Sequence, residues 1–229
     1  MSTVMGIQKA KHLFLEMDKK KPDIERPYMM FEKHDGWFGY LDFPSCIIHS
    51  RAQLEIPAVK ELSDLIRAHR PDVKGRLIFE IMIDGYEVDR FHELNGILNR
   101  KSEQAEDVYL RVHDFIPDFQ FCTMPAYHRY KFATEIVQRI GLPEVRLSPI
   151  LGFSNDPNEW QAMAEKIQSR GGEGLILKAI DALYTPDTDW TEIVRNSVPH
   201  DFVNVVEDAR IEKLMKRKFP GLSRSFYQG

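Results

Sequence analysis

"MFEKHDGW", residues 30–37, is the stretch on which the interpretation of this chain depends, because an apolar run ends there in charged residues and a glycine. Apolar residues followed by Asp-Gly are typical of a strand that enters a tight turn, since this dipeptide adopts positive φ at low cost. A second interpretation makes Lys33 a nucleophile. A lysine at the end of a buried strand lines the wall of a site, where desolvation or a second cation favours the neutral, attacking amine.

The composition of the 229-residue chain is that of a globular protein, with 43 % hydrophobic and 29 % charged residues, and this length is sufficient to bury a core. A net charge of −4 argues against a generally basic nucleic-acid-binding coat but is compatible with a local basic face. Cys46 and Cys122 belong to no Cys-x-x-Cys or Cys/His cluster, so we expect reduced thiols and no zinc. We also expect no membrane partner, because no apolar run has the length of a signal peptide or a membrane span.

Apolar periodicity predicts an alternation of short strands and helices without a regular strand-helix-strand repeat. Runs bounded by Gly, Pro or Asp predict strands over residues 28–33, 37–43, 45–50, 75–85, 107–117 and 173–180. Helical spacing predicts helices over residues 7–20, 56–69, 91–100, 127–140, 155–172 and 203–219. This order favours an α+β fold with largely antiparallel sheets over a doubly wound one.

Charged residues interrupt several strands that are otherwise suited to burial. Lys33, Glu80, Glu173 and Lys178 each lie within or at the edge of an apolar run. An unpaired charge in a core costs several kcal/mol, so such residues usually pair, bind a metal or line a cleft. We therefore expect a shared polar cleft with two cations and two carboxylates, the set that a nucleotide phosphate and its Mg²⁺ require.

Five motifs in this order resemble the covalent nucleotidyltransferase family, that is, ATP-dependent polynucleotide ligases and mRNA capping enzymes. They are KHDG (33–36), SRA (50–52), FEI (79–81), VHDFIP (112–117) and GGEGLILK (171–178). Lys-x-Asp-Gly alone is a weak signal, but together with the distant Glu-Gly-x-x-x-Lys it is specific. The resemblance covers about residues 28–190 and is nearest to phage-type ATP-dependent DNA ligases. It implies an ATP-grasp-like adenylation domain, with two largely antiparallel sheets and flanking helices that enclose a nucleotide cleft.

The resemblance implies roles for the first motifs. Lys33 would attack the α-phosphorus of ATP and become lysyl-AMP. Glu32 would contact the adenine edge, largely through its main chain, while Asp35 and Gly36 would shape the turn. Arg51 would contact ribose or a nucleic-acid phosphate.

The later motifs would complete the nucleotide site. Glu80 would bind ribose or assist the metal, and Glu173 would bind Mg²⁺. His113 lies where the family usually has Phe or Tyr stacked on adenine. Lys178 would contact the α-phosphate, where a cation stabilises the charge of a phosphoryl transfer.

Two departures from the family pattern concern phosphate contacts. The lysine motif usually continues to arginine, but position 38 is Phe, and Trp190 is followed by Thr-Glu where the family has two lysines. Lys216 and Lys218 could replace these lysines, although their spacing is also that of a solvated basic helix face.

The sequence also ends where ligases normally continue into an OB-fold domain. We expect an adenylation domain over residues 1–200, a basic helix and tail over residues 201–229, and no OB-fold. Arg210, Lys213 and Arg217 share one face of that helix and are candidates for nucleic-acid contact.

The expected function is that of an ATP-dependent DNA ligase that uses ATP and Mg²⁺ to seal 5′-phosphate/3′-hydroxyl nicks in duplex DNA through lysyl-AMP. We expect a monomer in the cytoplasm of a bacterium or a phage-infected host. The resemblance favours ATP over NAD as the AMP donor. NAD-dependent relatives carry a larger N-terminal module that holds nicotinamide, whereas only 32 residues precede Lys33 here. Two alternatives remain: an RNA ligase, and a non-catalytic nucleotide- or nucleic-acid-binding remnant of the family.

Overall fold

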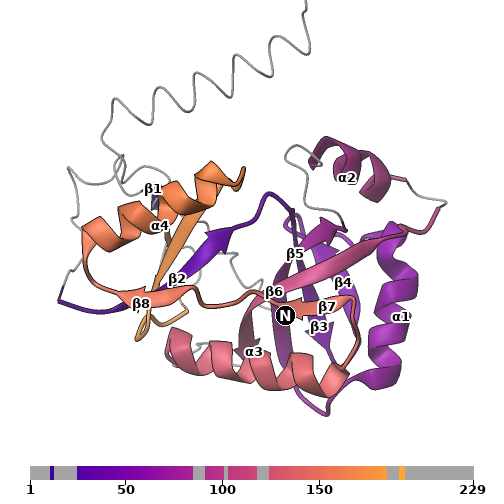
Figure 1. Cartoon of the computed structure of the whole chain (residues 1–229). Helices are drawn as coiled ribbons and strands as arrows, with labels where there is room; N and C mark the ends of the chain where they lie inside the picture. The colour runs from indigo at the N-terminus through magenta and orange to yellow at the C-terminus, as the bar shows by residue number, and fades with distance from the viewer. Residues whose placement is uncertain are drawn as a thin grey trace, which may run out of the picture.

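In the described part of the chain, the strands form two five-stranded sheets (Figure 1). A computed structural model describes residues 11–12, 25–84, 91–100, 103–117, 124–184 and 191–193. Sheet A has the order β1-β10-β9-β2-β8 and sheet B the order β4-β3-β5-β6-β7. Neighbouring strands are antiparallel except in the pairs β1 with β10 and β6 with β7. The expected α+β class with largely antiparallel sheets is therefore confirmed.

The strands of sheet A are β1 (Lys11–His12), β2 (Tyr28–Lys33), β8 (Gly152–Ser154), β9 (Gly174–Ala179) and β10 (Thr191–Ile193). The strands of sheet B are β3 (Trp37–Phe43), β4 (Ile47–Ser50), β5 (Gly75–Ile83), β6 (Val108–Pro117) and β7 (Val145–Leu147). The helices are η1 (Pro57–Val59, a 3₁₀ turn), α1 (Lys60–His69), α2 (Phe91–Leu98), α3 (Ala126–Ile140) and α4 (Pro157–Ser169).

Sheet A packs one face against α4, and its other face packs in part against α3 and carries two lysines. The packed face and the helix share one apolar cluster, formed by Tyr28, Met30, Leu175, Leu177, Ala179, Trp160, Ala164 and Ile167. On the adjacent strands, Met29 lies opposite Lys178 and Lys33 opposite Gly174. Because alternate residues of a strand share a face, both lysines lie on the face that points away from α4.

Sheet B has the same two-sided organisation. Its packed face supplies Leu41, Leu77, Phe79, Ile81, Leu110 and Val112 to the largest apolar cluster, together with residues of α1, α2 and α3. On the opposite face, Phe38 and Arg111 flank Glu80 in register on the neighbouring strands. A register shift at Ile78/Phe79 adds His113 to β6 as a bulge residue.

Helix α3 connects the two sheets and runs along the base of both (Figure 1). Ala126 and Tyr130 pack against Met29 and Phe31 of sheet A, while Ile136 belongs to the core beneath sheet B. The backbone N–H of Ala126 also donates to the carbonyl of Ala182, just beyond β9, over 2.9 Å. The helix thereby fixes where sheet A meets sheet B.

Most predicted elements are observed within a few residues, and the exceptions are short. The helix predicted over residues 7–20 is wrong at Lys11–His12, which pair with β10 as a strand. Pairing with a distant strand is a tertiary interaction that helical spacing cannot reveal. The remainder of that helix and the helix predicted over residues 203–219 lie outside the described residues. The strand predicted from residue 45 begins at Ile47, because Cys46 closes a turn by donating its N–H to the carbonyl of Asp42.

Strands β7, β8 and β10 were not expected from the sequence. Each has three residues, which is too few for an alternating pattern to be recognised. Within the described ranges, no helix is both long and apolar enough to cross a lipid bilayer.

Two glycines give a matched test of the fold. Gly75 has φ +144°, and a Cβ there would lie 2.3 Å from the Ile116 carbonyl oxygen. We expect Gly75→Ala to lower the free energy of unfolding by about 2 kcal/mol or more, through backbone strain and steric conflict. In α2 a Cβ on Gly96 would meet no atom within 4 Å, so Gly96→Ala should stabilise by about 0.5–1 kcal/mol. Urea denaturation measures both, and equal effects would contradict the description of Gly75.

Candidate active site

Lys33 ends β2 and contacts Glu173. Its Nζ forms an ion pair with Glu173 Oε2, and the two side chains are 22 % and 11 % exposed. Glu173 directly precedes β9, whose first residue, Gly174, lies opposite Lys33. The predicted nucleophile and a predicted metal ligand are therefore neighbours, and both can be reached by solvent.

The turn after Lys33 lies directly on β5. A Cβ on Gly36 would lie 2.5 Å from Met82 Sδ and 2.7 Å from Glu80 Cβ, so this approach needs a glycine. Burial raises the pKa of Glu80 to about 8, although Lys33 and Arg51 act in the opposite direction. A cation bound next to Glu80 would lower this pKa, because a nearby cation stabilises the charged form of a carboxylate.

A second group of charges lies deeper, at the junction of the two sheets. Asp114 Oδ2 accepts from Lys178 Nζ over 3.0 Å, and Asp114 Oδ1 accepts from Arg129 Nε over 3.0 Å. All three residues are buried. Burial alone would raise the pKa of Asp114, but Arg129 and Lys178 outweigh this effect and lower it to about 2. Burial lowers the pKa of Lys178 to about 8 against the opposing effect of Asp114, so Lys178 is still a cation at pH 7.

Two histidines connect these groups. His34 Nε2 lies 3.4 Å from Ser148 Oγ, and burial, followed by the charges of Arg111, Lys33 and Arg170, lowers its pKa to about 4. Burial, followed by the charge of Lys178, lowers the pKa of His113 to about 3, with a smaller contribution from His34. Both imidazoles are therefore neutral at pH 7. His34 is close enough to Lys33, and His113 close enough to Lys178, for the charge of each lysine to act on its neighbour.

The structure brings Lys33, Glu80, His113, Glu173 and Lys178 into one site and places the other predicted residues around it. The Glu32 side chain points to the α4 side of sheet A, where Arg170 Nη2 binds it over 2.5 Å. Contact between Glu32 and a nucleotide would therefore come from the main chain, as expected. Asp35 is exposed. The exposed Arg51 lies with Cζ 4.9 Å from the ring centroid of Phe38, so a guanidinium covers the position where the family usually has arginine.

Several residues that the sequence analysis singled out lie outside the described part of the chain. Arg210, Lys213 and Arg217, the candidates for nucleic-acid contact, lie outside the described residues. So do Trp190, Lys216 and Lys218.

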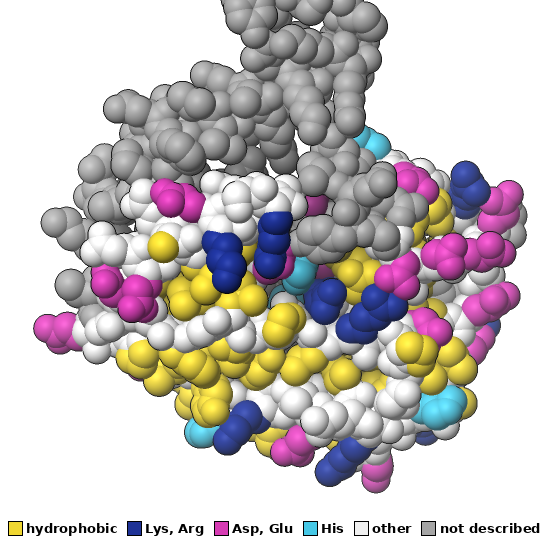
Figure 2. Space-filling model, in the orientation of Figure 1, with side chains coloured by type: hydrophobic (Ala, Val, Ile, Leu, Met, Phe, Trp, Pro, Cys, Tyr) yellow, Lys and Arg dark blue, Asp and Glu magenta, His cyan; other side chains and the backbone are white. Residues whose placement is uncertain are grey.

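Other residues of the site were missed from the sequence. Asp114 follows His113 in a motif already identified, so its charge within an apolar strand was the available signal. Arg129 and Arg111 carry no local pattern that distinguishes them from surface arginines. On the face of the molecule that Figure 2 shows, Lys and Arg side chains lie on both sides of a histidine.

The two carboxylates of the site fit a divalent cation that shares its coordination with a nucleotide. Among the described residues, no group of three or more His, Cys, Asp or Glu could hold a metal by itself. Mg²⁺ typically binds through one or two carboxylates together with phosphate oxygens and water. Glu80 and Glu173 are close enough that the charge of Glu173 raises the pKa of Glu80, and this pair meets that requirement.

Comparison with known proteins identifies the fold. No protein-family model matches the sequence, and no curated protein sequence matches it. A Lig E DNA ligase, from a study of DNA binding with a minimal scaffold, aligns with a TM-score of 0.65 and 20 % identity over 83 % of this chain. The chain has the fold of ATP-dependent DNA ligases. A Chlorella virus DNA ligase-adenylate aligns with a TM-score of 0.60 and 16 % identity over 80 % of this chain.

The ATP complex of the bacteriophage T7 ATP-dependent DNA ligase aligns with a TM-score of 0.55 and 16 % identity over 82 % of this chain. The chain covers 68 %, 63 % and 66 % of the Lig E, Chlorella virus and T7 chains, respectively, and 46 % of another matching structure, named Pmar-Lig. The likeness at these identities concerns the fold and not the activity.

The raised pKa of Glu80 predicts a pH-dependent stability. The folded-state pKa of about 8 lies above the ordinary value of 4.5, so the folded state binds more protons than the unfolded state between these values. Stability should therefore fall as pH rises through this window. In metal-free buffer at pH 9, the free energy of unfolding of Glu80→Gln should exceed that of the parent by about 1–3 kcal/mol, whereas at pH 4.5 it should not exceed it. Urea denaturation at the two pH values measures this difference. Exposed Glu135→Gln is the control, and a pH-independent difference for Glu80→Gln would contradict the assignment.

The buried charges predict a large cost for removing one partner. Arg129→Leu should lower the free energy of unfolding by about 3–5 kcal/mol, because buried Asp114 loses one of its two cationic partners and the carbonyls of Met124 and Ala182 each lose a donor. Arg139→Leu, on the exposed side of the same helix, should change stability by less than about 0.5 kcal/mol. Guanidinium denaturation compares the two, and a mild effect at Arg129 would show that the cluster is not structural.

Proposed function

We propose that this chain is an ATP-dependent DNA ligase whose first step transfers AMP from ATP to Lys33. One observation carries the proposal: Lys33, in contact with Glu173, shares a face of sheet A with the buried Lys178 in a fold shared with ATP-dependent DNA ligases. This arrangement offers a nucleophile, a cation for the α-phosphate and carboxylates for a metal. It is the set that in-line transfer at phosphorus requires.

In the first step, Lys33 Nζ attacks the α-phosphorus of ATP. An N–P bond forms, the bond from the α-phosphorus to the oxygen of the β-phosphate breaks, and pyrophosphate leaves. The amine gives up its proton to water, which reaches the partly exposed side chain. Lys178 stabilises the charge that develops on the α-phosphate, and Asp114 holds its ammonium in place over 3.0 Å.

The remaining residues bind and orient the nucleotide. Glu80 and Glu173 would hold Mg²⁺, which supplies positive charge to the phosphate oxygens when bound. Neutral His113 offers a planar ring to adenine, and the main chain at Glu32 offers hydrogen bonds to its edge. Asp35 and Gly36 shape the turn that presents Lys33.

In the later steps, AMP passes from Lys33 to the 5′-phosphate of a nick, and the 3′-hydroxyl then displaces AMP. Exposed Arg51 is the described candidate for phosphate contact at the nick. Arg210, Lys213 and Arg217 are candidates for contact with the duplex, and the similarity to a Lig E ligase that binds DNA with a minimal scaffold supports such a partner. We propose a monomeric enzyme that acts on nicked duplex DNA.

A non-catalytic remnant is the second candidate, favoured by Phe38 and by the Thr-Glu that follows Trp190. Incubation with labelled ATP and Mg²⁺, followed by denaturing electrophoresis, separates it from the enzyme. The enzyme forms a covalent band with the parent protein, whereas the remnant forms none. Sealing of nicked DNA and nicked RNA by the parent then separates a DNA ligase from an RNA ligase.

Two arginine substitutions test the roles of the lysines. Lys33→Arg should abolish the labelled band as completely as Lys33→Ala, because a guanidinium remains protonated and cannot act as the nucleophile. Lys178→Arg should retain part of the rate, since its role is electrostatic. Exposed Lys166→Arg is the control and should label like the parent. An active Lys33→Arg protein would refute the nucleophile assignment.

A further inference from the structure

Arg111 lies in the middle of β6, on the face of sheet B that carries Glu80. It is opposite Glu80 of β5 and Arg146 of β7, and residues that are directly opposite each other share a face. Its guanidinium carbon lies 5.3 Å from the ring centroid of Tyr109. Two arginines therefore flank one tyrosine beside the candidate active site, since Arg146 lies 4.0 Å from the same centroid.

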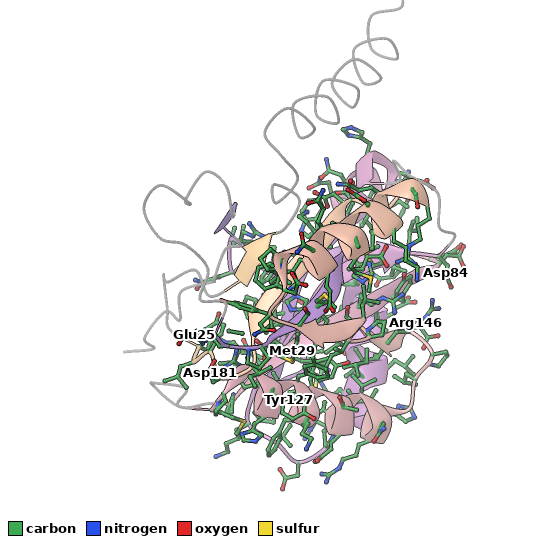
Figure 3. All side chains as sticks on the ribbon, turned by 60° about the vertical axis from the view of Figure 1, so that its left-hand side comes forward. Glu25, Met29, Asp84, Tyr127, Arg146 and Asp181 are labelled. Carbon is green, nitrogen blue, oxygen red and sulfur yellow. The ribbon has the colours of Figure 1, made fainter. Side chains whose placement is uncertain are left out.

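The two arginines differ in their partners. Arg146 donates from both terminal nitrogens to Asp84, over 2.8 and 2.9 Å, and Figure 3 shows these two side chains side by side. Arg111 donates only to uncharged oxygens, the Leu147 carbonyl at 3.3 Å and the Tyr109 hydroxyl at 3.4 Å. Its Nε is buried without a hydrogen-bond partner. Among the described side chains, no carboxylate forms an ion pair with Arg111.

The surroundings of Arg111 are already positive. Arg111, Lys33 and Arg170 are the three cations that lower the pKa of His34 after burial. Lys33 is paired with Glu173 and Arg170 with Glu32. Arg111 is thus the one of these three cations that forms no ion pair with a described carboxylate. Its charge does lower the pKa of Asp84, but Asp84 is bound by Arg146, and a partly buried guanidinium in that state is stabilised by an anion.

We propose that Arg111 binds a phosphate group of the substrate beside Lys33. Arginine suits this ligand because its planar fork of N–H donors matches phosphate oxygens. The source of the phosphate rests on the proposed function: it is either the pyrophosphate part of ATP or the 5′-phosphate of a nick. Both offer the same chemistry to the guanidinium, and the sequence lacks the expected phosphate-binding lysines after Trp190.

The test uses two ligands and four proteins: the parent, Arg111→Gln, Arg111→Lys and Arg76→Gln. Glutamine can still donate to the Leu147 carbonyl, so the fold should persist, and the melting temperature checks this. Arg76 is a matched control, because it also lies against a tyrosine, Tyr40, but is paired with Asp42 over 2.8 Å. Calorimetry measures the affinity for magnesium pyrophosphate, and a second titration compares nicked duplexes with a 5′-phosphate and with a 5′-hydroxyl.

We expect Arg111→Gln to weaken phosphate binding about tenfold or more, the cost of one charge-assisted hydrogen bond. Arg111→Lys should weaken phosphate binding less than Arg111→Gln does, and Arg76→Gln should bind phosphate with the affinity of the parent. A loss with pyrophosphate assigns the site to the triphosphate, whereas a loss confined to the 5′-phosphorylated duplex assigns it to the nick. Unchanged affinity for both ligands overturns the proposal, as does a parent that recognises neither phosphate. Failure of the proposed function would appear separately, as absence of lysyl-AMP in a parent that still binds pyrophosphate through Arg111.

Discussion

The contact on which the rest of the structure depends is the buried carboxylate of Asp114 between Arg129 and Lys178. It joins β6 of sheet B to α3 and to β9 of sheet A, the three elements that meet beneath the site. A charge removed from water is tolerated only with well-placed partners. Arg129 also donates to the carbonyls of Met124 and Ala182, so the cluster fixes both the start of α3 and the chain after β9. The angle between the sheets is therefore constrained at the point where Lys178 enters the site.

From this constraint follows a site with two unlike halves. In the outer half, Lys33, Glu173 and Glu80 are partly exposed, and under the proposed function they would exchange partners when a nucleotide and a metal bind. In the inner half, the side chains of Lys178 and Asp114 are buried and hydrogen-bonded to each other. Neutral His34 senses the charge of Lys33, and neutral His113 senses the charge of Lys178. An arrangement with an exchangeable nucleophile and a fixed cation suits a reaction in which one lysine forms a bond and the other only supplies charge.

Sequence patterns predicted the parts of this site that depend on local chemistry. Glu80, Glu173 and Lys178 interrupt apolar strands, and a strand has few reasons to carry a charge. Gly36 follows from the Asp-Gly turn, although its contact with Met82 and Glu80 does not. The pairing of Asp114 with Arg129, the position of Arg111 beside Tyr109 and the short strands β1, β7, β8 and β10 all depend on which distant segments meet. Periodicity within one segment contains no information on such contacts, so these features required the structure.

The central claim is that Lys33 receives AMP from ATP, and peptide mapping by mass spectrometry tests it most directly. The parent protein is incubated with ATP and Mg²⁺, its intact mass is measured, and the adduct is located after digestion at neutral to alkaline pH, because a phosphoramidate is labile in acid. The account predicts one AMP per chain, carried by the peptide that contains Lys33 and removed when pyrophosphate is added back. No adduct, or an adduct on another residue, would contradict it.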